Sequence, residues 1–153
     1  MNTGDGTMDT VKKAEQLFLD GYNCAQAVFG AFCEQGGVPL DLAMKLSSSF
    51  GGGVGRQREI CGAVSGMCMA AGILYGYETP ETGENKAEHY CLIRELCEQF
   101  KQQNGSIICR EILKNAEVGG TPAARTNEYY ANRPCLKCVH DAAEILDTYI
   151  RSK

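Results

Sequence analysis

The residues best suited to chemistry in this chain are its cysteines, nine in 153 residues, or about 6%. They are spread over several segments: Cys24, Cys33, Cys61, Cys68, Cys91, Cys97, Cys109, Cys135 and Cys138. This share lies below the roughly 8–10% typical of a disulfide-built secreted scaffold. Thiolates bind metals and act as nucleophiles in redox reactions. The sequence therefore predicts sulfur chemistry, with a metal, with thiol redox, or with both.

The strongest local motif is the C-x-x-C formed by Cys135 and Cys138, which the pattern places at a helix start. Backbone N–H groups at a helix start stabilise a thiolate. A thioredoxin-like site would need a βαβ setting, and covalent haem would need His directly after the second cysteine, whereas Val139 precedes His140. A zinc ribbon would need a second C-x-x-C. We predict that these two thiols either join a site completed by distant cysteines or form a thiol redox pair.

The second motif is the glycine-rich segment FGGGVGRQREICGAVSG at residues 50–66. Glycines before a helix can expose backbone N–H groups to an anion or to the sulfides of a cluster, which makes Gly52, Gly53 and Gly62 candidate cofactor-binding residues. The segment is not a P-loop, because no Gly-Lys-Ser/Thr follows. A tight turn with close helix packing at Gly62 and Gly66 explains the same residues. Both interpretations stay open.

The elements that must position these residues are helices, because apolar side chains recur every three or four residues. The pattern predicts helices over 9–35 with a bend at Gly21, then over 40–50, 59–74, 81–103, 107–115 and 134–150. The third is apolar nearly all round and is predicted to be the central buried helix. Residues 1–8 are predicted to be a disordered lead and 115–133 a long loop. The expected fold is an all-α, single-domain bundle of five or six helices over residues 9–153.

Composition excludes several function classes. The net charge is -4 and no basic run occurs, so we expect no nucleic-acid binding. No stretch approaches the roughly 18 apolar residues of a membrane span, and the N-terminus lacks a secretory pattern. We therefore expect a cytoplasmic protein, where cysteines serve metals or catalysis more often than structural disulfides. No Ser–His–Asp arrangement or paired carboxylates suggest a hydrolase, and an exposed third helix would allow a homodimer.

Five blocks of the sequence, taken together, resemble a known family. They are GYNCAQAVF (21–29), FGGGVGR (50–56), CGAVSG (61–66), GSIICREIL (105–113) and CLKCVHDAAEIL (135–146). In this order they resemble the redox-active proteins named for a C…GCAxxG…C…C pattern, over about residues 10 to 150. The resemblance implies an all-helical domain with a redox role. Related domains occur attached to multihaem cytochromes, where an iron–sulfur centre has been considered.

Carried over by position, the resemblance implies that Cys24, Cys61, Cys109 and Cys135 are the family thiols. The sequence departs from the pattern in one place, since Gly62 follows the second of these cysteines instead of preceding it. The resemblance implies that the four thiols bind an iron–sulfur cluster, or less favourably zinc, for electron transfer with a redox partner protein. The alternatives are a metal-free thiol–disulfide protein and a non-catalytic helical interaction module.

The remaining candidates are weaker. Cys33, Cys68, Cys91 and Cys97 lie outside the pattern, and some are expected only to fill the core. His89 and His140 are more often surface or hydrogen-bonded residues than metal ligands. Three arginines lie beside the thiol motifs, where they would either lower thiolate pKa values or be solvated helix-end charges: Arg56, Arg58 and Arg110.

Overall fold

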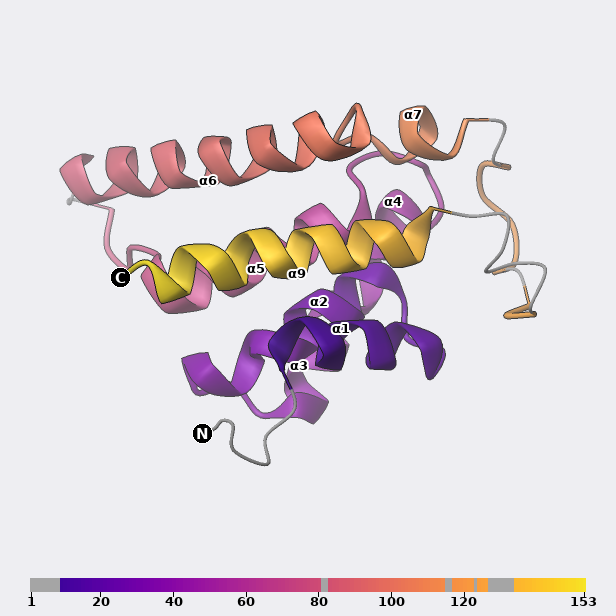
Figure 1. Cartoon of the computed structure of the whole chain (residues 1–153), viewed down its shortest axis with the longest axis horizontal. Helices are drawn as coiled ribbons and strands as arrows, with labels where there is room; N and C mark the ends of the chain where they lie inside the picture. The colour runs from indigo at the N-terminus through magenta and orange to yellow at the C-terminus, as the bar shows by residue number, and fades with distance from the viewer. Residues whose placement is uncertain (1–8, 81–82, 115–116, 123, 127–133) are drawn as a thin grey trace.

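The structure, a computed structural model, describes residues 9–80, 83–114, 117–122, 124–126 and 134–153 (Figure 1). In these ranges six helices have eight or more residues: α1 (Thr10–Leu19), α2 (Cys24–Phe32), α3 (Leu40–Ser47), α5 (Gly62–Tyr75), α6 (Gly83–Asn104) and α9 (Cys135–Arg151). Shorter turns are α4 (Gly51–Val54), α7 (Cys109–Leu113) and the 3-10 segments Cys33–Gly36 and Ser48–Phe50. Over the described residues the predicted all-α bundle is confirmed.

The first predicted helix is in fact two helices, so the expected bend at Gly21 is a break. α1 ends at Leu19, and Gly21 has a φ of +110°, which favours glycine. α2 then starts with a capping box, in which the Asn23 side chain accepts from the Gln26 N–H at 2.9 Å and the Gln26 side chain accepts from the Asn23 N–H at 3.0 Å. As a result Cys24 is the first residue of a helix.

α5 is the central helix, as its all-round apolar sequence predicts. It packs against α2, α6 and α9, and α9 crosses in front of it in Figure 1. Two of its glycines permit the close approach to α2. A Cβ atom on Gly66 would lie 2.7 Å from the carbonyl oxygen of Ala25, and one on Gly62 would lie 3.1 Å from the Ala25 nitrogen. The close-packing interpretation of these glycines is confirmed.

α5 begins at Gly62, three residues later than predicted, because the preceding residues are extended and paired with the segment before α7. The Cys61 N–H donates to the Ile107 carbonyl at 2.8 Å, and the Cys109 N–H donates to the Glu59 carbonyl at 2.6 Å. The segments that carry Cys61 and Cys109 are therefore paired through their backbones. Helical periodicity in the sequence does not reveal this pairing.

The glycine run ends the α3 region in a left-handed turn. All of residues 52–56 have φ between 58° and 72°, and two of them, Val54 and Arg56, carry side chains that disfavour this conformation. Position 53 accepts only glycine, since a Cβ atom there would lie 2.6 Å from the Glu59 nitrogen. Such strained backbone tends to occur at functional sites.

Some predictions lie partly or wholly outside the described residues. The predicted lead 1–8 is outside them, as are 115–116, 123 and 127–133 of the predicted loop. The described parts of that loop, 117–122 and 124–126, contain no helix or strand. Among the described residues no helix is both long enough and apolar enough to cross a membrane.

The two glycines of α5 that differ in surroundings give a matched test of the packing. Gly66→Ala forces a methyl group against the Ala25 carbonyl and is expected to lower the free energy of unfolding by about 1–3 kcal/mol. Gly72→Ala, where a Cβ meets nothing within 4 Å, is expected to raise it by about 0.5–1 kcal/mol. Urea denaturation followed by circular dichroism measures both. Equal effects at the two positions would contradict the packing argument.

Candidate functional site

A cavity of about 390 Å³ lies at one end of the bundle, where α4, α7 and the start of α9 gather (Figure 1). Five of the nine cysteines line it: Cys24, Cys61, Cys109, Cys135 and Cys138. The candidate glycines also line it: Gly52, Gly53 and Gly62. The structure thus brings together every residue proposed from the sequence as a ligand, a redox thiol or a cofactor-binding glycine.

The starts of helices position these cysteines. Cys24, Cys109 and Cys135 are the first residues of α2, α7 and α9, and Cys61 is the N-cap residue of α5. Cys138 lies one turn further along α9. Helix starts carry a partial positive charge, which favours an anionic sulfur. The backbone therefore directs several thiols, each from a different helix, at one place.

Two thiol–thiol contacts cross the cavity between helices. Cys24 hydrogen-bonds to Cys135, and this contact, together with burial, raises the pKa of Cys24 well above its ordinary value. A second hydrogen bond joins Cys61 and Cys138. Each cysteine of the C-x-x-C therefore contacts a sulfur on another helix.

The surroundings of Cys61 favour its ionisation, in contrast to those of Cys24, Cys109 and Cys138. The hydrogen bond from Cys138, followed by the backbone N–H groups of Ala63 and Val64, lowers the pKa of Cys61 in spite of its burial. The same contact, with burial and the charge of Asp141, raises the pKa of Cys138. This contact therefore makes Cys61 the more easily ionised thiol of the pair and keeps Cys138 protonated.

Cys109 lies opposite a buried arginine. Arg58 Nη1 is 3.8 Å from the Cys109 sulfur, and Arg58 itself is only 4% exposed. Burial raises the pKa of Cys109, and the Arg58 guanidinium partly offsets this by favouring the thiolate. The expected effect of Arg58 on a thiolate is confirmed in direction. Arg110 instead forms an exposed ion pair with Glu59 at 3.1 Å.

The cavity has a positive lining. Three arginines line it, Arg56, Arg58 and Arg125, and its described lining includes no aspartate or glutamate. Arg125 donates to the carbonyls of Phe18 at 3.1 Å and Tyr22 at 2.9 Å and lies over the Phe18 ring. Thiolates or an anionic group in the cavity would therefore be electrostatically favoured.

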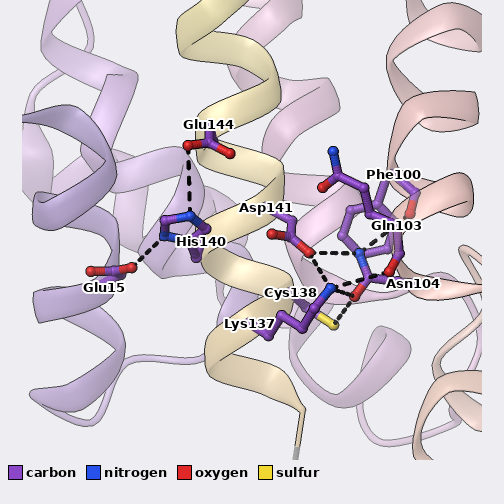
Figure 2. Close-up of polar contacts among 9 residues, drawn as sticks. All are labelled: Glu15, Phe100, Gln103, Asn104, Lys137, Cys138, His140, Asp141 and Glu144. Atoms are coloured by element: carbon purple, nitrogen blue, oxygen red, sulfur yellow. Dashed lines mark hydrogen bonds and ion pairs between the residues drawn. The ribbon is translucent and has the colours of Figure 1, made fainter.

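A polar network behind Cys138 orients the start of α9 (Figure 2). The Cys138 sulfur lies 3.7 Å from Asn104 Oδ1, and this oxygen accepts a hydrogen bond from Lys137 Nζ at 3.2 Å. Asn104 Nδ2 donates to Asp141 at 3.1 Å, and Lys137 forms an ion pair with Asp141 at 2.6 Å. These contacts tie α9 to the end of α6 and restrict the position of the Cys138 thiol.

The other cysteines and the histidines lie elsewhere. Cys33 is fully buried and its thiol donates to the Gly30 carbonyl, as expected of a core residue. His140 points away from the Cys138 network and contacts Glu15 at 2.5 Å (Figure 2). His89 lines a second cavity near Tyr77 and not the cysteine cavity.

The described residues include no group of three or more His, Cys, Asp or Glu side chains arranged to hold a metal ion. Four of the five cavity thiols form two pairs instead, and the fifth, Cys109, faces Arg58. A tetrahedral zinc site needs four sulfurs about 3.8 Å apart, given zinc–sulfur bonds of about 2.3 Å. A single zinc ion would therefore require the thiols to move closer together.

Comparison with known proteins identifies the family. Residues 22–149 match the family model described as "Putative redox-active protein (C_GCAxxG_C_C)". The chain belongs to this family. The matched range contains all five cavity cysteines. The resemblance inferred from the five sequence blocks is confirmed.

A curated relative of this redox-family chain is an uncharacterised protein from Archaeoglobus fulgidus. It is 27% identical over 152 aligned residues, which cover 90% of this chain and 93% of the relative. No solved structure gives a significant match. The family therefore supports a cysteine-rich redox protein, and the chemistry of the site rests on the geometry above.

Sequence reasoning missed the residues that support the thiols. Asn104 and Arg125 approach the cavity region from distant positions, and neither lies in one of the blocks that suggested the family. The pairing of Cys61 with Cys138 was also missed, because only the fold sets those two helix starts side by side. Apart from the cysteines, the glycine-rich segment at residues 50–66 was the sequence feature that indicated residues lining the cavity.

The pKa difference gives a test at Cys61. Iodoacetamide should alkylate Cys61 before Cys24, Cys109 and Cys138 as the pH is raised, with a midpoint below that of free cysteine, because its thiolate is favoured at lower pH. Cys138→Ala removes the donor and should shift this midpoint to higher pH. Mass spectrometry of the alkylated peptides measures the rates, with buried Cys33 as the unreactive reference. An unchanged midpoint in Cys138→Ala would contradict the hydrogen-bond explanation.

Proposed function

We propose that the protein is an electron-transfer protein in which the cavity thiols hold an iron–sulfur cluster. The observation that carries the proposal is the convergence of five cysteines from four helix starts on one arginine-lined cavity. Cys24, Cys61, Cys109 and Cys135 are the proposed ligands, with Cys138 as a fifth thiol beside them. Thiolate ligands are the usual ligands of such clusters.

The residues that line the cavity fit an iron–sulfur cluster. All candidate donors are sulfur, and the cavity volume of about 390 Å³ leaves room between them. A Cβ on Gly53 would lie 2.8 Å from the Cys109 Cβ, and one on Gly62 would lie 3.2 Å from the Cys24 Cβ, so larger residues would crowd two of the ligands. Thiols that contact each other in pairs, with no group of three placed around one point among the described residues, suit a cluster with several metal atoms better than one zinc ion.

The chain's own residues would bind the group and tune it. Arg58 and the helix starts would balance the negative charge of four thiolates, and Phe18, Ile112 and Leu113 would limit water. When bound, the cluster would supply reversible one-electron transfer, exchanged with a redox partner protein. The cysteine thiols must lose their protons to bind, so binding would release protons.

The first test of this proposal is metal content. Full-length protein purified without oxygen, or reconstituted with iron and sulfide, is expected to show visible absorbance near 400 nm with bound iron and sulfide. The quadruple variant C24S/C61S/C109S/C135S should lose both. Elemental analysis and visible spectra measure this. Reconstituted protein that binds neither iron nor sulfide would refute the cluster.

The matched control is Cys91→Ser, since Cys91 is exposed and does not line the cavity. It should keep full iron content. Circular dichroism of the quadruple variant checks that its helices are retained, so that metal loss reflects lost ligands. Equal iron loss in Cys91→Ser would mean that iron binds nonspecifically to thiols.

A second function is favoured by one observation, the contact between Cys61 and Cys138. The lowered pKa of Cys61 beside a protonated Cys138 suits thiol–disulfide exchange. The Cys61 thiolate would attack a disulfide of the substrate and release one thiolate. Cys138 would then attack the sulfur of Cys61, which forms the internal disulfide and releases the second substrate thiol. The substrate gains the two electrons that the protein loses.

Metal-free protein treated with oxidised glutathione tests this second function. We expect loss of two titratable thiols and a peptide that links Cys61 to Cys138. Cys138→Ser should instead retain glutathione on Cys61, because the resolving thiol is absent. Thiol titration and mass spectrometry measure both. An unchanged thiol count in the wild-type protein would contradict the exchange activity, whatever the metal content.

A further inference from the structure

A third thiol pair lies outside the cysteine cavity. The sulfurs of Cys68 on α5 and Cys97 on α6 are 3.9 Å apart. Neither residue lines the cavity, and both are partly exposed. This differs from Cys33, which is fully buried and hydrogen-bonded to a carbonyl as a core residue.

We propose that Cys68 and Cys97 form a second redox site, which a hydroperoxide oxidises to a disulfide that joins α5 to α6. The proposal is independent of the cluster and of the Cys61–Cys138 exchange. A disulfide needs its sulfurs about 2.05 Å apart, so the two side chains must close the present separation by about 1.9 Å. Rotation of the two side chains, with a small shift between α5 and α6, would have to supply this change.

The chemistry needs one attacking and one resolving thiol. The sulfurs lie within hydrogen-bond distance, and this contact lowers the pKa of Cys97 and raises that of Cys68, so Cys97 is the more easily ionised thiol and the attacking one. Cys97 attacks one peroxide oxygen, the O–O bond breaks, and a sulfenic acid forms with release of water or alcohol. Cys68 then attacks that sulfur, the S–S bond forms and a water leaves. The two thiols lose two electrons and two protons, and the peroxide takes them up.

The disulfide would restrain α6 against the bundle. α6 buries only Leu92, Leu96 and Phe100 among its described residues, and Cys97 follows Leu96 directly. The bond would close a covalent loop of about 30 residues between the two helices. We therefore expect the oxidised form to melt about 5–10 °C above the reduced form.

The test uses the full-length protein and limiting hydrogen peroxide, followed by alkylation of free thiols and peptide mass spectrometry. We expect a peptide linking Cys68 to Cys97, and oxidation of Cys97 at least about tenfold faster than that of exposed Cys91 on the same helix. Cys68→Ser should leave Cys97 as a sulfenic acid that dimedone traps. The matched control Cys91→Ser should form the link at the wild-type rate.

The double variant C24S/C135S separates this site from the cavity. It should form the Cys68–Cys97 link at the wild-type rate even if it binds no iron. Loss of the link in this variant would overturn the proposal, because oxidation would then pass through the cavity thiols. Oxidation of Cys97 no faster than that of Cys91 in the wild-type protein, or a Cys97 disulfide with any other cysteine, would also overturn it.

Discussion

The close contact between α5 and α2 is the constraint on which the cysteine cavity depends. Gly62 and Gly66 let the backbone of α5 approach Ala25, and this contact sets the start of α5 beside the start of α2. The antiparallel pairing of residues 58–61 with 107–110 then brings Cys109 to the same end. The thiols are thus gathered by backbone contacts that do not require any bond between the sulfurs.

The pKa values of the cavity thiols shift in different directions. Burial opposes ionisation of Cys24, Cys61, Cys109 and Cys138. Cys61 also receives a sulfur hydrogen bond and two backbone N–H groups, whereas Cys109 receives only partial help from Arg58. Without a metal, the cavity therefore favours the thiolate of Cys61 over those of Cys24, Cys109 and Cys138. With a metal, further thiols would ionise, and the arginines would reduce the electrostatic cost.

The sequence predicted the helices well and their contacts poorly. The sequence indicates α9 because its apolar side chains recur every three or four residues, and α5 because it is apolar nearly all round. The glycines at 51–53 indicate the turn that they form. Periodicity could not reveal that Ile60 pairs with Ile108, because a two-residue bridge has no period. The cysteine set came from the family resemblance, whereas the partners of each thiol depend on which helix starts meet, which is a property of the tertiary packing alone.

Three sulfur contacts between cysteines each join two different helices. Cys24–Cys135 joins α2 to α9, Cys61–Cys138 joins α5 to α9, and Cys68–Cys97 joins α5 to α6. A disulfide or a shared metal at any of these contacts would therefore hold helices together rather than close a local turn. Because native-state cross-links and ligands stabilise the folded protein, the state of the sulfurs and the packing of the bundle must be thermodynamically coupled. α9 takes part in both cavity contacts, so a bond at either contact would hold the start of α9 to another helix.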